Sequence, residues 1–135
     1  MVMKIEDIEG IGPSFGAKLR EAGISSVGKL LEKGAGPSGR KSIAEQTGID
    51  SARILKWVNL SDLCRISGIS TQYSELLEAA GVDTVKELRN RNAENLHLKI
   101  VEVNAAKKLV RKTPALKSIQ SWVEQAKSMA PAVTY

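Results

Sequence analysis

One stretch of this chain occurs twice, and this duplication limits what the chain can fold into. Residues 5–30 align with residues 63–88 at a constant offset of 58 and without a gap. The identical pairs are all apolar residues or glycines: Ile8/Ile66, Gly10/Gly68, Ile11/Ile69, Leu19/Leu77, Ala22/Ala80, Gly23/Gly81, Val27/Val85 and Leu30/Leu88. Because such residues fix a core and a backbone, the alignment predicts one small structural unit that is built twice.

The composition favours helices for this unit. Aromatic residues are few, whereas Ala, Leu, Ile, Lys and Glu are abundant. A half of about 60–70 residues would bury only about 60% of its unfolded surface if it stood alone. We therefore expect an all-α protein with two tandem repeats of about 60–65 residues each, packed as one compact helical unit.

Glycine, proline and capping residues divide the two copies into short predicted helices, and the candidate caps include Ser25, Ser26, Asp50, Ser61, Asp83 and Asn92. The first repeat is assigned to residues 1–59 and the second to residues 60–129, and residues 130–135 are expected to form a frayed tail. The copies match again at residues 54–58 (ILKWV) and 119–123 (IQSWV), now at an offset of 65, so the second copy holds seven extra residues. Each tryptophan of these segments is expected to close the core of its own repeat. The predicted helices are 4–9, 13–22, 26–33, 38–47, 51–59, 61–66, 71–80, 84–90, 93–111 and 114–129.

The run Gly10-Ile11-Gly12 lies between two predicted helices, and Pro13 begins the second of them. Glycines permit a tight turn with positive φ, the isoleucine fills the space between the helices, and the proline suits a first helical turn. This segment resembles the helix-hairpin-helix motif. The resemblance implies binding of duplex DNA without sequence readout, through backbone amides that hold a phosphate, and a cation held by hairpin carbonyls in some members. The second copy keeps Gly68 and Ile69 but has Ser70 and Thr71 in place of glycine and proline.

The chain as a whole resembles an uncharacterised bacterial family of tandem helix-hairpin-helix proteins, which is catalogued as a domain of unknown function. The resemblance is carried by GIGPSFGAKLREAGI, by ILKWVNLSDLCRISGISTQYSELLEAAGVDTVKELRNRNAENLH and by SWVEQAK. No activity can be transferred from its members. The resemblance implies a fold and points to nucleic-acid binding.

The charge distribution is compatible with a nucleic-acid partner. The net charge is +5, and no acid lies between residues 103 and 123. If the helix there extends to residue 111, Lys107, Lys108 and Arg111 share a face that could contact phosphates. The alternative is that these cations only form a solvated helix surface. Near the first hairpin, Glu6, Asp7 and Glu9 would repel a phosphate unless they point away.

Other classes of function find little support. One histidine, His97, and one cysteine, Cys64, supply no set of residues for a catalytic triad or a metal cluster. GAGPSGRKS lacks the spacing of a P-loop, and the scarcity of aromatic side chains disfavours single-strand binding. We expect no enzymatic activity, no cofactor and no metal. The N-terminus shows no signal peptide or membrane span, which predicts a soluble cytoplasmic protein.

Two hypotheses remain. The leading one is a non-enzymatic module that binds duplex DNA through its phosphates, and the alternative is a protein-interaction adaptor whose hairpins are purely structural turns. A contiguous positive patch would favour the first hypothesis and an exposed apolar patch the second. A membrane partner and a small-molecule substrate are not expected. The residues predicted to contact nucleic acid are Gly10, Ile11, Gly12, Lys18, Gly68, Ile69, Lys107, Lys108, Arg111 and Lys112.

Overall fold

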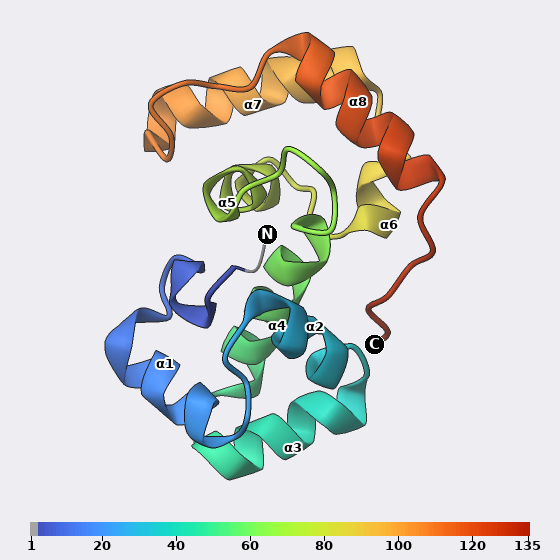
Figure 1. The fold of residues 1–135 in the computed structure, drawn as a ribbon. Coiled ribbons are helices and arrows are strands. Elements are labelled where there is room, and N and C mark those ends of the chain that lie inside the picture. The colour runs from blue at the N-terminus through green and yellow to red at the C-terminus, as the bar shows by residue number, and fades with distance from the viewer. Residues whose placement is uncertain (1–2) are drawn as a thin grey trace. The chain divides into compact units, whose positions relative to one another are not determined.

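The computed structural model describes residues 3–135, and these residues form eight α-helices and one short 3-10 turn without any β-strand (Figure 1). The prediction of an all-α protein is confirmed. The chain divides into two compact units, of which the first extends to Asp62 and includes Ala132–Tyr135, and the second is Leu63–Pro131. Met1 and Val2, which were assigned to the first repeat, lie outside the described residues.

The helices of the two units follow one another with short connections. The first unit holds η1 (Ile5–Asp7), α1 (Gly12–Glu21), α2 (Val27–Gly34), α3 (Pro37–Thr47) and α4 (Ser51–Leu63). The second holds α5 (Thr71–Ala79), α6 (Val85–Leu88), α7 (Ala93–Lys107) and α8 (Leu116–Lys127), with α7 packed on α5 and α8.

Several predicted helices differ from the structure, and the expected helix 4–9 is only the 3-10 turn Ile5–Asp7. The expected helix 51–59 continues without a break to Leu63 as helix α4, and residues 64–66 of the expected helix 61–66 are not helical. Ser61 does not cap a new helix, because its hydroxyl donates to Trp57 O at 2.8 Å within α4. The expected helix 93–111 ends at Lys107, and Lys108 follows it in the left-handed region.

Side-chain caps begin several helices. Ser26 Oγ accepts the amide of Lys29 at the start of α2, and Asn92 Oδ1 accepts that of Asn95 at the start of α7. Both residues were predicted caps. At α6 the cap is Thr84, one residue after the predicted Asp83.

Positions that correspond in the two copies, at an offset of 58 or 65, share their backbone conformation and their core contacts. Gly10 and Gly68 have φ of 92° and 97°. The ring of Phe15 lies 5.5 Å from that of Trp57 at 57°, and the ring of Tyr73 lies 5.6 Å from that of Trp122 at 51°. Both tryptophans are buried, so each lies in the core of its own unit as predicted.

The C-terminal residues are packed, which corrects the prediction of a frayed tail. Val133 is buried, and the amide of Thr134 donates to Ala35 O at 2.8 Å. The guanidinium of Arg40, which is only 7% exposed, donates to Thr134 O at 2.7 Å and lies 5.8 Å from the ring of Tyr135. A buried cation that needs carbonyl acceptors thus fixes this segment in the first unit.

Candidate nucleic-acid interface

The first hairpin exposes its backbone around a buried isoleucine. Ile11 is buried and donates its amide to Ile8 O at 3.3 Å, whereas Gly10 and Gly12 are exposed with φ of 92° and 61°. Helix α1 begins without a side-chain cap, and Pro13 occupies its first turn. The amides of a first helical turn have no partner within the helix, so the start of α1 is suited to an anion.

The acids beside this hairpin are engaged elsewhere or lie at the surface. Glu6 accepts two hydrogen bonds from Arg20, at 2.6 and 2.8 Å, and this contact lowers the pKa of Glu6 to about 2. Asp7 accepts the amide of Lys4 at 2.9 Å, and Glu9 is exposed. The charge of Glu6 is therefore compensated by Arg20, which reduces the repulsion expected from the sequence.

Two cations flank the aromatic pair behind the hairpin. Lys18 is exposed, and its Nζ lies 5.9 Å from the ring centroid of Phe15. The guanidinium of Arg53, from α4, lies 5.2 Å from the same centroid. Sequence reasoning missed Arg53, although it precedes the predicted core residue Trp57 by four residues and so shares its helix face.

The second hairpin has the same buried centre, and side chains occupy two of its backbone donors. Gly68 is exposed and Ile69 is buried, as in the first hairpin. The side chain of Gln125, from α8, accepts the amide of Ser67 at 3.1 Å and donates to its carbonyl at 3.2 Å. Ser70 Oγ accepts the amide of Tyr73 at 3.2 Å. These contacts occupy backbone donors that a phosphate would need, and nothing in the sequence around residue 125 indicated this role.

The predicted basic helix face does not exist, because α7 ends at Lys107. Lys108 has φ 53° and ψ 46°, and its amide donates to Asn104 O at 2.8 Å. The side chain of Asn104 accepts the amide of Val110 and donates to the Val110 carbonyl, each at 3.0 Å. An asparagine that binds backbone in this way competes with the helix ladder, so Lys107 and Arg111 do not share a helix face.

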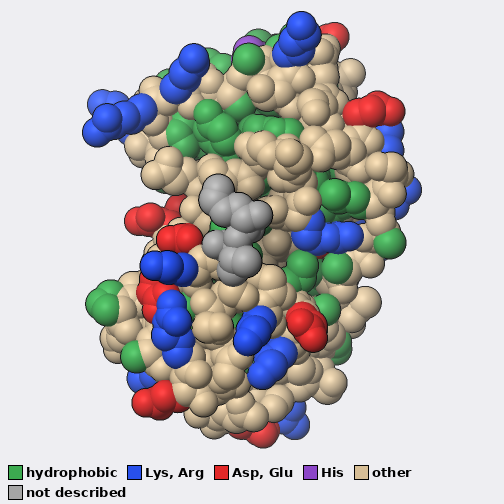
Figure 2. Space-filling model, in the orientation of Figure 1, with side chains coloured by type: hydrophobic (Ala, Val, Ile, Leu, Met, Phe, Trp, Pro, Cys, Tyr) green, Lys and Arg blue, Asp and Glu red, His purple; other side chains and the backbone are tan. Residues whose placement is uncertain are grey.

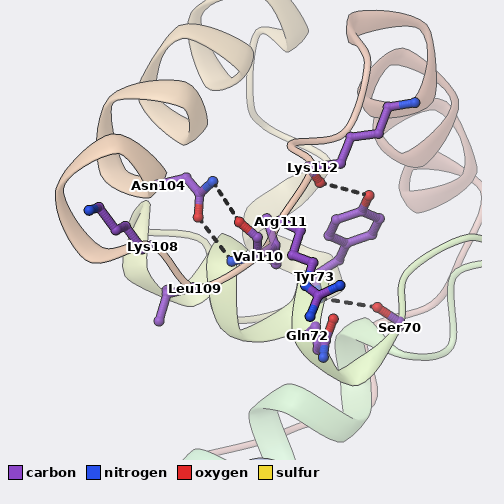
Figure 3. A pocket seen from close by; sticks show the side chains of 9 residues that line it. All are labelled: Ser70, Gln72, Tyr73, Asn104, Lys108, Leu109, Val110, Arg111 and Lys112. Atoms are coloured by element: carbon purple, nitrogen blue, oxygen red, sulfur yellow. Dashed lines mark hydrogen bonds between the residues drawn. The ribbon is translucent and has the colours of Figure 1, made fainter.

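The segment of residues 108–112, hereafter the 108–112 loop, borders a hollow of about 880 Å³ together with the start of α5 (Figure 3). Tyr73 donates its hydroxyl to Lys112 O at 3.1 Å and so joins the loop to α5. No carboxylate lines the hollow among the described residues. Lys and Arg side chains gather at the end of α7 in Figure 2. Residues that line the hollow include Ser70, Gln72, Tyr73, Lys108, Arg111 and Lys112.

The structure thus brings together part of the predicted interface. Three of the four cations predicted after residue 106 line the hollow beside α5, and Lys107 does not line it. Gly10 and Ile11 directly precede α1, the helix of the first unit that holds Gly12 and Lys18. Gly68 and Ile69 do not line the hollow.

Features of other classes of site are absent from the described residues or are explained by packing. No three His, Cys, Asp or Glu side chains between residues 3 and 135 come together as metal ligands. Burial raises the pKa of the Cys64 thiol, against a smaller opposite effect of its hydrogen bond with Ser74. The GPSGRK segment begins helix α3 directly after helix α2. None of the helices in the described part of the chain has both the length and the apolar character needed to cross a membrane.

Comparison with known proteins gives a family and no activity. The family model described as "Domain of unknown function (DUF4332)" matches residues 9–129 of the chain. No solved structure matches the chain.

Proposed function

The chain belongs to the DUF4332 family of domains of unknown function, and we propose that it is a non-enzymatic module of two helix-hairpin-helix units that binds duplex DNA. Binding involves the phosphates and no base readout, and a cytoplasmic location is part of this proposal. The two units correspond through glycines of matching φ and through matching aromatic pairs. These features support a common hairpin architecture.

The observation that carries the proposal is the first hairpin. Its exposed glycines, Gly10 and Gly12, flank a helix start without a side-chain cap. Backbone amides at such a position bind phosphate oxygens and carry no sequence information. Lys18 supplies an exposed cation further along the same helix, and Arg53 supplies a second from α4.

Contacts to bases fit the geometry less well. Phe15 packs against Trp57, and Tyr73 packs against Trp122, so these rings are engaged in the cores of the two units. Stacking on free aromatic faces supplies much of the energy of single-strand binding. The aromatic residues of the hairpins are therefore better suited to packing than to stacking on a base.

The proposal is tested by fluorescence anisotropy with a labelled duplex of about 25 base pairs at several salt concentrations. We expect micromolar affinity at moderate salt and a slope of log affinity against log salt of about 3 to 6, since each phosphate contact contributes about 0.9. Lys18→Glu and Arg53→Glu should each weaken binding. Lys41→Glu, an exposed cation of α3, is the control with the same change in charge. The absence of binding even at low salt would overturn the proposal.

A protein-interaction adaptor remains the second candidate because one surface feature favours it. Leu98 and Val101 lie three residues apart on α7 and are 68% and 42% exposed. Exposed apolar side chains on one helix face are typical of contacts with another protein. If Leu98→Gln and Val101→Gln leave duplex binding unchanged, this face does not contribute to the interface with DNA.

A further inference from the structure

We propose that the 108–112 loop is a preorganised binding element for consecutive phosphates of one nucleic-acid strand, with Asn104 and Tyr73 as its positioning residues. This inference rests on the proposed function, because it names a second phosphate-binding element of the same module. It assigns to the second unit a different mode of binding from that of the first.

The loop is held from two sides. Asn104 binds both backbone groups of Val110 at 3.0 Å, and the hydroxyl of Tyr73 donates to Lys112 O at 3.1 Å. Tyr73 itself packs on the buried ring of Trp122, so the loop is connected to the core of the second unit. A loop that is ordered before binding loses less conformational entropy when the ligand arrives.

The chemistry of the hollow favours a chain of phosphates over a single small anion. Three cations lie within five residues, and among the described residues no carboxylate lines the hollow beside them. In Figure 3 the side chains of Lys108 and Lys112 extend away from each other, and that of Arg111 lies between them. Cations spread along a loop match phosphates spaced along a strand, and a guanidinium can bind one of them with two parallel hydrogen bonds.

The neighbouring groups are compatible with phosphates and offer little to a base. Ser70 lines the hollow, and its hydroxyl accepts the amide of Tyr73 while retaining a proton to donate. The ring of Tyr73 is packed against Trp122, and its hydroxyl is bound to Lys112. The hollow therefore presents hydrogen-bond donors and cations at its surface.

The two units differ at the hairpin and in the length of the segment that contains the 108–112 loop. The hairpin of the second unit is closed by Gln125, whose side chain occupies both backbone groups of Ser67. The seven residues by which the second copy exceeds the first lie between about 89 and 118, and this region contains the 108–112 loop. This region of the second copy supplies the cations of the loop, whereas side chains occupy two backbone donors of its hairpin.

The test separates the shape of the loop from its charge. Tyr73→Phe and Asn104→Ala change no charge and should each weaken duplex binding by about two- to tenfold, the effect of losing one or two hydrogen bonds that order the loop. Lys108→Gly and Lys112→Gln each remove one cation and should lower the salt slope by about 0.9. Lys86→Gln, an exposed cation of α6, is the matched control and should leave the slope unchanged. Circular dichroism confirms that each variant is folded.

Each outcome decides the inference. If the chain binds the duplex and the loop variants behave like Lys86→Gln, the inference is overturned and the proposed function stands. If the cations matter but Tyr73→Phe and Asn104→Ala bind as the unaltered chain does, the loop is not preorganised and the inference is also overturned. Competition by tripolyphosphate as strong as that by duplex DNA, at equal phosphate concentration, would identify free polyphosphate as the ligand and would overturn the inference of a nucleic-acid strand. No duplex binding at all overturns both proposals.

Discussion

The side-chain amide of Gln125 holds both backbone polar groups of Ser67. The Ser67 amide donates to Oε1 at 3.1 Å, and Nε2 donates to the Ser67 carbonyl at 3.2 Å. These contacts fix the turn that precedes Gly68 onto α8. At the offset of 65 the first unit has Leu60 in the place of Gln125, and leucine has no polar group to offer. The two hairpins therefore share a backbone and differ in how it is held.

Gln125→Ala should lower the free energy of unfolding by about 1–2 kcal/mol, because two hydrogen bonds to backbone groups are lost. Urea denaturation measures this change. Gln120→Ala is the matched control, since Gln120 is an exposed residue of the same helix, and its effect should stay within about 0.5 kcal/mol. Equal losses in the two variants would mean that Gln125 does not hold the hairpin.

The repeated pattern made part of the fold predictable. Identical glycines and apolar residues 58 positions apart constrain φ and the core, and the structure confirms the buried pair Ile11 and Ile69 and the positive φ of Gly10 and Gly68. Local chemistry also sufficed for the cap at Ser26, where a side-chain oxygen lies just before a run of helix-forming residues.

The remaining features depended on side-chain contacts that the sequence pattern does not indicate. The end of α7 follows from the contact of Asn104 with Val110, and a lysine at the left-handed position carries no signal of its own. Ser61 matches the pattern of a cap, yet its hydroxyl binds Trp57 O inside α4. Of the candidate interface, the cations were visible in the sequence, but the hollow they line required the contact between Tyr73 and Lys112.

The ion pair of Glu6 and Arg20 should make stability depend on pH. The hydrogen bond from Arg20 lowers the pKa of Glu6 from 4.5 to about 2. A carboxylate whose pKa is depressed by folding stabilises the fold above its unfolded pKa, and this contribution is lost as the pH falls through the folded value. The difference in unfolding free energy between the unaltered chain and Glu6→Gln should therefore be constant above about pH 5.5 and shrink between there and pH 2.

Urea denaturation at a series of pH values measures this difference. Glu45→Gln, an exposed carboxylate of α3, is the control and should show a weaker dependence on pH. A constant difference for Glu6→Gln down to pH 2 would show that the pair does not contribute. Because both side chains are partly exposed, added salt should reduce the effect.

Arg40 should contribute more to the free energy of unfolding of the first unit than its other cations do. Its guanidinium donates to Gly34 O and Ala35 O at 2.9 Å and to Thr134 O at 2.7 Å, and the side chain is 7% exposed. Arg40→Met leaves these carbonyls without their donor and should lower the free energy of unfolding by about 3 kcal/mol. Amide exchange at Thr134 should accelerate as the tail is released.

The neighbouring Lys41→Met is the control for that experiment, because Lys41 is exposed on the same helix. Its effect should stay within about 0.5 kcal/mol, as for most surface substitutions. Slow exchange at Thr134 in Arg40→Met would show that the tail is held by other contacts, such as the hydrogen bond from its own amide to Ala35 O.

The glycines of the two hairpins should respond differently to the same substitution. Alanine at φ of 92° or 97° is strained, which costs about 1–2 kcal/mol at either position. At Gly68 the added Cβ would also lie 2.9 Å from Trp122 Nε1, whereas at Gly10 the nearest atom, Trp57 Nε1, is 4.0 Å away. Gly68→Ala should therefore lower the free energy of unfolding further, by about 1–3 kcal/mol more than Gly10→Ala, because the buried indole must move.

Gly28→Ala, a helical glycine with open space around it, should instead stabilise the chain in the same urea titration. Equal losses for Gly10→Ala and Gly68→Ala would contradict the tighter contact of the second hairpin with its tryptophan.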